Sequence, residues 1–256
     1  MGGSGAIGER ATVAEGHGWA LTVLGGFELR REDVEVRLPR GCQRLVGLLA
    51  LKEQPLPRSL IATVLWADAS ATQAAASLRS TLWRLGRSGP GLVGVSTSRV
   101  WIGSGVAVDL RDARVTAHRA LSGELATGAE MDLRPLTEDV LPGWYDDWAI
   151  IERERFRQLR LHALEALCRS LASAGRFAAA IEAGMTAVAE EPLRESAHRA
   201  LIQTFVSAGN RSAAIRQFEM LRRLLWKELG VEPSDQSTAL WRSITPTVRT
   251  GQPAAE

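Results

Sequence analysis

A helix expected at residues 72–87 carries side chains of the kind that read nucleic-acid bases. At 100° per residue, one side is an apolar stripe made of Ala74, Leu78, Leu82 and Leu85. The opposite side, flanked by Arg79, Thr81 and Trp83, presents Gln73, Ser77, Ser80, Arg84 and Arg87. Arginine can contact guanine N7 and O6 together, glutamine can contact adenine in the same way, and hydroxyls suit phosphates or base edges. The helix could therefore be buried on its leucines while its polar side enters a DNA major groove.

A β-hairpin is expected directly after this helix, at Leu92–Ile102, with its turn at Ser96–Ser98. Arg99 stands at the tip, where it could enter a minor groove that attracts arginine electrostatically. Alone, the polar helix face would be an ordinary solvated surface and Arg99 an ordinary turn arginine. The order of helix and hairpin favours DNA binding over that interpretation. Three arginines near helix ends could hold phosphates, although each alone is better explained as a surface charge: Arg40, Arg44 and Arg58.

The chain before this helix has the pattern of a small sheet followed by two helices. Trp19–Leu38 alternates apolar and polar residues, which predicts two or three antiparallel strands. The period changes at Cys42–Lys52, where leucines recur at helical spacing, and Ser59 can cap a second helix. A loop at Asp68–Ser70 precedes the polar helix, and Ser88-Gly89-Pro90-Gly91 ends it. A sheet, three helices and a terminal hairpin in this order predict a winged helix-turn-helix domain.

The rest of the chain is expected to form long helices with an internal repeat. Asp109–Ser122 predicts one helix, and from about Trp148 to Ile244 the pattern is almost continuously helical. Ser173-Ala174-Gly175 recurs as Ser207-Ala208-Gly209, an offset of 34 residues, and alanines and leucines match at the same offset. This period is the tetratricopeptide signature, in which neighbouring helix pairs stack because none can bury its own apolar face.

The predicted fold class is mainly α with small β-sheets. A winged helix-turn-helix domain at 19–108 is followed by an α-helical tetratricopeptide-like repeat domain at 109–245. Flexible tails are predicted at 1–18 and 246–256. The glycine-rich start formally matches a dinucleotide-binding fingerprint, but it lacks the preceding strand that this fingerprint needs.

Composition and motifs exclude several classes of protein. No segment approaches the roughly 20 apolar residues that span a bilayer, and we recognise no signal peptide, so no membrane partner is expected. Cys42 and Cys168 lack metal-ligand spacing, which predicts reduced thiols in a cytoplasmic, nucleoid-associated protein without a bound metal. No nucleophile elbow, zinc motif or convincing carboxylate pair is found, so we expect no catalytic residues and no enzyme. Basic residues outnumber acidic ones within residues 21–110, which favours a polyanionic partner there.

Several stretches of sequence carry a family resemblance. The second and third helices resemble those of OmpR-type effector domains and read SLIATVLW followed by SLRSTLWRLGR. The second half resembles the bacterial transcriptional activator domain in LPGWYDDWAIIERERFRQLRLHALEAL, SAGRFAAAIEAGMTAVAEEPLRESAHRALI and RRLLWKELGVEPS. Together, over about residues 20–245, they resemble the Streptomyces antibiotic regulatory protein family, the small activators of specialised-metabolite gene clusters.

The resemblance implies a transcriptional activator that binds direct repeats in double-stranded promoter DNA near the −35 element, as side-by-side protomers. It implies recruitment of RNA polymerase through the sigma factor and the alpha subunit. By position, the polymerase-contact loop would be Ala67, Asp68, Ala69 and Ser70. The DNA-facing residues would include Ser77, Thr81, Arg84 and Arg87.

The chain departs from the family pattern at two positions of the third helix. Gly86 stands where the family often has arginine, and Trp83 stands at a usually polar position. Glycine inside a helix costs up to about 1 kcal/mol relative to alanine, which bears on the end of the helix and on the aim of Arg87. No G-x-x-x-x-G-K-[ST] motif occurs, so no ATP use and no cofactor are expected.

A protein-interaction adaptor is the alternative interpretation. Helical repeats commonly bind peptides, and the winged helix could have lost DNA binding. Sequence preference and salt sensitivity in a band-shift assay would distinguish the two, because only a DNA reader should show both.

Overall fold

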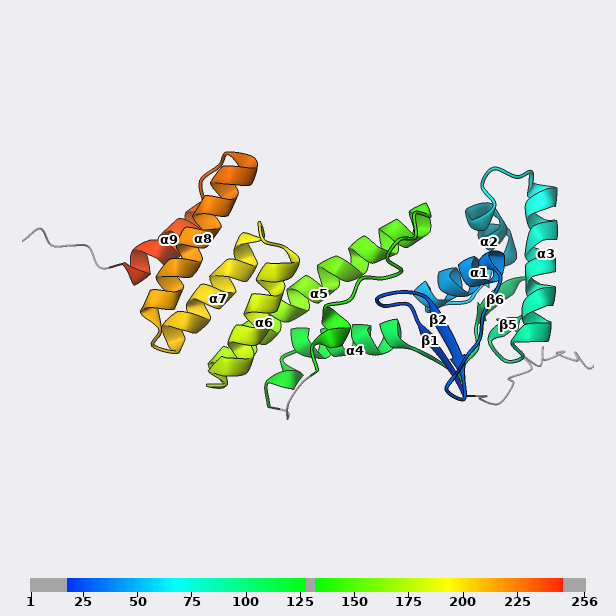
Figure 1. The fold of residues 1–256 in the computed structure, drawn as a ribbon, viewed down its shortest axis with the longest axis horizontal. Helices are drawn as coiled ribbons and strands as arrows, with labels where there is room; N and C mark the ends of the chain where they lie inside the picture. Colours follow the sequence, from blue (N-terminus) through cyan, green and yellow to red (C-terminus); the bar gives the residue numbers. More distant parts are fainter. Residues whose placement is uncertain (1–17, 128–131, 246–256) are drawn as a thin grey trace, which may run out of the picture. The chain divides into compact units, whose positions relative to one another are not determined.

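The computed structural model describes residues 18–127 and 132–245, so both predicted tails, apart from Gly18, lie outside the described residues. The chain divides into two compact units. The first joins residues up to Asp112 with Glu138–Arg155, and the second joins Ala113–Thr137 with the chain from Phe156 onward. Two of the three boundaries fall within helices α4 (Asp109–Leu121) and α5 (Asp147–Ser173), and the third lies between Thr137 and Glu138. Figure 1 traces the elements of each unit along the chain.

The first unit begins with a sheet whose described strands lie in the order β3-β2-β1-β7. Antiparallel pairing joins β1 (Trp19–Thr22) to β2 (Glu28–Arg31) and β2 to β3 (Val34–Glu35). Along β1, buried Trp19 and Leu21 alternate with exposed Ala20, the period of a strand with one covered face. These strands confirm the prediction from the alternating pattern. The parallel strand β7 (Val106–Val108) was not predicted, because it pairs with β1, a strand that lies far from it in the sequence.

Three helices and a second sheet complete the winged helix-turn-helix order. The helices are α1 (Arg40–Leu51), α2 (Arg58–Leu65) and α3 (Ala71–Ser88). The described strands of the second sheet have the order β4-β6-β5, with bounds Leu56–Pro57 for β4, Val93–Val95 for β5 and Arg99–Ile102 for β6. Figure 1 shows α3 along the side of this unit, with α1 and α2 on its inner side and the β5–β6 hairpin near its end.

The prediction that Ser59 caps α2 is wrong. The helix starts at Arg58 after Pro57, and no side chain accepts a hydrogen bond at this N-terminus. The backbone N–H of Arg58 instead donates to the carbonyl oxygen of Ser98 in the hairpin turn, 2.9 Å away. The passage from β4 to α2 is therefore determined by strand pairing and proline, not by a serine cap.

Residues 138–155 pack with the first unit, whereas the sequence pattern placed them in the repeat domain at 109–245. The backbone N–H of Leu141 donates to the carbonyl oxygen of Val23 at 2.8 Å, beside the end of β1. Trp144 is only 6% exposed and stacks on Phe27 with ring centroids 5.7 Å apart. A Cβ added at Gly47 of α1 would lie 3.3 Å from the indole, so this glycine gives the ring its space. The segment is thus part of the core beneath the winged helix.

The second unit is an array of helices. It contains most of α4, two short 3-10 turns at Glu124–Thr127 and Arg134–Leu136, and the C-terminal part of α5 from Phe156 onward. The described helices that follow are α6 (Phe177–Glu190), α7 (Glu195–Ser207), α8 (Arg211–Leu229) and α9 (Asp235–Ile244). In Figure 1, α6, α7 and α8 run side by side in alternating directions. The mainly helical fold with small sheets is the predicted class.

The internal repeat ends its helices in the same way twice. After α5, Gly175 adopts φ 72°, its N–H donates to Ala172, and the N–H of Arg176 donates to Leu171. After α7, Gly209 adopts φ 74° and makes the equivalent bond to Val206, followed by Asn210 N–H to Phe205. This pattern of two bonds around a left-handed glycine is the Schellman motif. The repeat seen in the sequence therefore corresponds to two equivalent helix–turn–helix corners.

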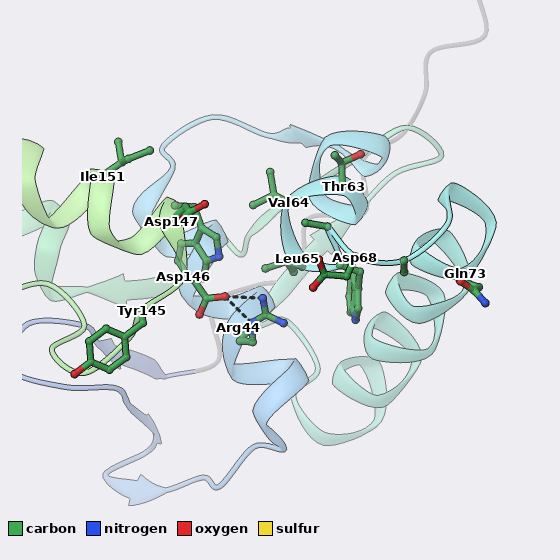
Figure 2. Close-up of a pocket in the computed structure, with 14 residues that line it drawn as sticks. Arg44, Thr63, Val64, Leu65, Asp68, Gln73, Tyr145, Asp146, Asp147 and Ile151 are labelled. Carbon is green, nitrogen blue, oxygen red and sulfur yellow. Dashed lines mark hydrogen bonds and ion pairs between the residues drawn. The ribbon is translucent and has the colours of Figure 1, made fainter.

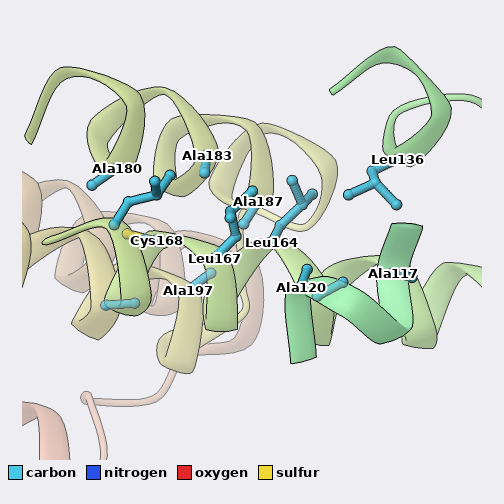
Figure 3. Packing of buried hydrophobic residues seen from close by; sticks show 13 residues of the cluster. Ala117, Ala120, Leu136, Leu164, Leu167, Cys168, Ala180, Ala183, Ala187 and Ala197 are labelled. Carbon is cyan, nitrogen blue, oxygen red and sulfur yellow. The ribbon is translucent and has the colours of Figure 1, made fainter. Parts of the chain in front are cut away.

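Small residues form the centre of the second unit. Figure 3 shows Ala180, Ala183 and Ala187 of α6 facing Leu164 and Leu167 of α5. All five are buried. Alanine keeps neighbouring helix axes close, so the matched alanines of the repeat mark helix contacts.

Candidate nucleic-acid interface

Helix α3 begins with a capping box. The hydroxyl oxygen of Ser70 accepts the backbone N–H of Gln73 at 3.3 Å, and the Gln73 Oε1 accepts the backbone N–H of Ser70 at 3.2 Å. Both residues satisfy polar groups that a helix start would otherwise leave unpaired. Ser70, predicted to contact polymerase, and Gln73, predicted to read DNA, therefore also fix where the recognition helix begins.

Burial along α3 defines its two faces. Ala74, Leu78 and Leu85 are buried as predicted, and Leu82 is half-buried. Five of the predicted DNA-contacting side chains on this helix are exposed: Gln73, Arg79, Ser80, Arg84 and Arg87.

Thr81 is the predicted contact that the structure removes. Its side chain is 5% exposed, and its hydroxyl donates to the carbonyl oxygen of Ser77, 2.9 Å away. A threonine in a helix commonly bonds to the carbonyl four residues earlier in this way. Ser77 is half-buried at the edge of the face. The buried side is therefore centred closer to Thr81 than the leucine spacing indicated.

Trp83 occupies the centre of the exposed face, although the sequence analysis placed it on the flank. It is 63% exposed, and the guanidinium carbon of Arg87 lies 4.9 Å from the centroid of its ring. Because Leu82 is only half-buried, the buried face is centred on Ala74, Leu78 and Leu85, and Trp83 lies opposite that centre.

Arg84 lies at the edge of the exposed face that borders α1. Burial raises the pKa of the Cys42 thiol in α1, and the positive charge of Arg84 partly offsets that rise. Arg79, Arg84 and Arg87 all lie on a helix whose sequence contains no aspartate or glutamate. The exposed side of α3 is consequently positive without an internal carboxylate to neutralise it.

The hairpin β5–β6 stands directly after α3, as predicted, and backbone carbonyls hold its arginines. Arg99 is exposed just after the turn, and its Nη1 donates to the carbonyl oxygen of Pro55 at 2.9 Å. Arg58 Nη1 donates to the carbonyl oxygen of Ser96 at 3.1 Å. Arg58 therefore anchors the hairpin turn. Arg99 would have to break its exposed hydrogen bond to the Pro55 carbonyl to reach a ligand.

The two other arginines considered for phosphate binding have structural partners. Arg40 lies over the Trp144 ring at 4.1 Å, a cation–π contact. Arg44 donates to Asp146 Oδ1 from Nε at 3.0 Å and from Nη2 at 2.5 Å. Both therefore join α1 to residues 138–155 of the same unit.

The loop between α2 and α3, predicted to contact polymerase, borders an open hollow of about 970 Å³. Figure 2 shows Asp68 on the α2–α3 side of this hollow and Tyr145 and Ile151 on the α5 side. Tyr145 is 83% exposed. Asp68 and Asp147 are exposed and, within the described part of the chain, make no ion pair. The loop thus belongs to a wider surface that combines free carboxylates with exposed apolar side chains.

Residues 134–245 match the family model of the bacterial transcriptional activator domain. This part of the chain is a bacterial transcriptional activator domain. The chain is also 29% identical over 213 residues to the regulatory protein AfsR of Streptomyces coelicolor, covering 79% of this chain and 21% of AfsR. The match begins before α5, and residues 138–155 of the matched stretch pack in the same unit as the winged helix.

A solved structure has the same fold. It is that of Mycobacterium tuberculosis EmbR in complex with a low-affinity phosphopeptide, with a TM-score of 0.67 and 19% sequence identity over 89% of this chain and 65% of that one. This chain spans about a fifth of the length of AfsR. The activator-domain match and the similarity to AfsR confirm the predicted resemblance to the Streptomyces antibiotic regulatory protein family.

Two further findings apply to the described ranges, residues 18–127 and 132–245. Within them, no group of three His, Cys, Asp or Glu side chains is arranged to hold a metal ion. Within the same ranges, no helix has both the length and the apolar character needed to cross a bilayer.

Proposed function

We propose that the protein is a sequence-specific DNA-binding transcriptional activator. In this proposal α3 enters the major groove of double-stranded promoter DNA, and the β5–β6 hairpin approaches the adjacent minor groove. The observation that supports it best is the exposed face of α3, which presents Arg79, Arg84 and Arg87 on a helix without carboxylates. Such a face suits the phosphate backbone, and its arginines suit guanine.

The finer parts of the proposal concern its site and partners. We infer that protomers bind side by side on direct repeats near the −35 element and act in the nucleoid on a specialised-metabolite gene cluster. The sigma factor and alpha subunit of RNA polymerase are the proposed partners of Ala67, Asp68, Ala69 and Ser70. The similarity to AfsR, named a regulatory protein, supports the regulatory role. The free carboxylate of Asp68 on an open surface supports the polymerase contact.

A band-shift assay on the region upstream of the neighbouring gene cluster tests this function. A protein that neutralises about six phosphates should lose about three orders of magnitude of affinity between 50 and 200 mM salt. Arg84→Ala should cost about 1–3 kcal/mol on the preferred site and relax its base preference. Equal losses on random DNA would contradict base reading by Arg84.

The adaptor interpretation keeps one supporting observation. Trp226, Leu229 and Val231 are exposed at the end of α8 and just beyond it, a surface that a peptide could cover. An adaptor that no longer reads DNA would show neither a preferred sequence nor a salt-dependent specific complex, so the same assay decides between the two functions.

A further inference from the structure

The exposed face of α3 has an aromatic centre. From the directions of Ala74, Leu78 and Leu85, helix geometry places Trp83 within about 20° of the point opposite the buried face. A large apolar side chain that is 63% exposed is unusual at the middle of a face otherwise made of arginines and small residues. Trp83 would therefore be the first side chain of this helix to contact any surface that the helix enters.

Arg87 is held against this ring. It follows Trp83 by one helical turn, and its guanidinium carbon lies 4.9 Å from the ring centroid. A cation stacked on indole loses rotamer freedom before binding, so less is lost when it then donates to a base. Trp83 and Arg87 thus form one preorganised pair directed to the same place.

We propose, resting on the proposed DNA-binding function, that Trp83 contacts the C5-methyl group of a thymine while Arg87 reads a guanine in a neighbouring base pair. The thymine methyl is the apolar group displayed in the major groove, and guanine N7 and O6 accept both donors of an arginine fork. The 4.9 Å between guanidinium and ring is comparable to the rise of about 3.4 Å per base pair, so the two side chains would address adjacent steps.

The surroundings of Trp83 favour nucleic acid over a protein surface. Its neighbours on the exposed face are Arg79, Ser80 and Arg87 together with the small Ala76 and Gly86, and α3 contains no acidic residue. A docking site for protein would extend the apolar area, whereas no other large apolar side chain adjoins this indole on the face and two cations do. Charge complementarity therefore points to a polyanion that also offers an apolar group.

Replacement of thymine by uracil tests the proposal, because uracil lacks only the methyl group. The preferred duplex is first selected from random sequences with the full chain, and each thymine is then changed to uracil in turn. We expect wild-type affinity to fall about fourfold at one thymine, the value for one buried methyl group. Trp83→Ala should bind the thymine and uracil duplexes equally at that position, and Trp83→Phe should restore the difference.

A matched control is available in the second unit. Trp226 of α8 is also 63% exposed, so Trp226→Ala removes an equally exposed indole and should retain full uracil sensitivity. Circular dichroism verifies that each variant is folded. Arg87→Lys should lose preference for the guanine next to that thymine, since lysine lacks the planar fork.

Three outcomes would overturn the inference. Trp83→Ala could keep the uracil sensitivity, could weaken binding equally on every sequence, or could leave single-site binding intact and abolish only cooperative binding of two protomers. The last result would assign Trp83 to a protein interface. Failure of the proposed function looks different, because wild-type protein would then select no sequence at all.

Discussion

At the scale of single residues, Thr81 and Gln73 show how the helix can engage its own polar side chains. Thr81 bonds to the Ser77 carbonyl, and Gln73 closes the capping box with Ser70. Both residues match the chemistry of base reading, yet only the exposed Gln73 keeps amide donors on the surface. Residue type alone therefore does not identify a DNA contact.

His198 is a buried polar residue of the second unit. It is 0% exposed, its Nε2 donates to the carbonyl oxygen of Pro192 at 3.0 Å, and its Nδ1 accepts the Gln217 amide at 2.9 Å. Burial lowers the pKa of His198 below its usual 6.5, although the bonds to Pro192 and Gln217 partly oppose that shift. The imidazole is therefore neutral in the folded protein near pH 7.

The stability of the second unit should depend on pH through His198. Above pH 6.5 the imidazole is neutral in both states, and its contribution to the free energy of unfolding is fully present. As pH falls below 6.5, the unfolded state takes up the proton first, so this free energy should decrease by up to about 1.4 kcal/mol per pH unit.

Chemical denaturation from pH 8 to pH 5 measures this effect. His198→Gln should flatten the pH dependence even if it lowers stability at every pH. His162→Gln is the control, because His162 is exposed on α5 and should leave the slope unchanged. An unchanged slope in His198→Gln would contradict the assignment.

At the scale of elements, the passage from α2 to α3 joins two surfaces. Its last residue, Ser70, begins the recognition helix, while Asp68 faces the hollow shared with the start of α5. DNA binding and partner binding can therefore be separated by substitutions a few residues apart.

We expect Asp68→Arg to abolish activation while leaving DNA affinity within about twofold. Asp68 is exposed and makes no ion pair in the described structure, so reversal should not disturb the fold and should change fold stability by less than about 0.5 kcal/mol. In vitro transcription at full promoter occupancy measures the effect. Glu35→Arg provides a charge reversal on strand β3, where an exposed ion pair with Arg37 and a weaker attraction to exposed Arg30 are lost.

Normal transcript levels from Asp68→Arg at full occupancy would remove the loop from the activation surface. A loss shared by Glu35→Arg would instead indicate a general effect of net charge.

At the scale of the whole molecule, the activator domain and the unit that contains the winged helix are not separate segments of chain. The family match begins at residue 134, yet residues 138–155 pack in the unit that contains the winged helix. The segment is joined to the rest of the unit by Leu141 and Trp144, and Arg153 donates hydrogen bonds within the segment itself. A fragment ending at residue 108 would therefore expose apolar core.

Trp144→Ala should destabilise the first unit by about 3–5 kcal/mol, because it removes a buried indole from between Phe27 and Gly47. DNA affinity should fall as a consequence, although Trp144 lies outside the residues proposed to touch DNA. Thermal unfolding and band shifts measure both effects. Tyr145→Ala is the control, since Tyr145 follows Trp144 in sequence and is 83% exposed. Equal effects of the two substitutions would contradict a packing role of Trp144.

The sequence by itself determined the helical stretches, the antiparallel strands of the first sheet and the hairpin, and their order. The leucine spacing of α3, the glycines after α5 and α7, and the alternation in β1 each follow from local geometry, which a few neighbouring residues express. The activator motifs were also readable, because they are contiguous in the chain.

Only the tertiary structure decided which side of each element is covered and by what. The burial of Thr81, the central position of Trp83 and the parallel pairing of β7 with β1 depend on segments far apart in sequence. The same holds for the insertion of Trp144 beside Gly47. Periodicity records that a face is apolar, but the partner that buries it is selected by packing in three dimensions, which no local pattern encodes.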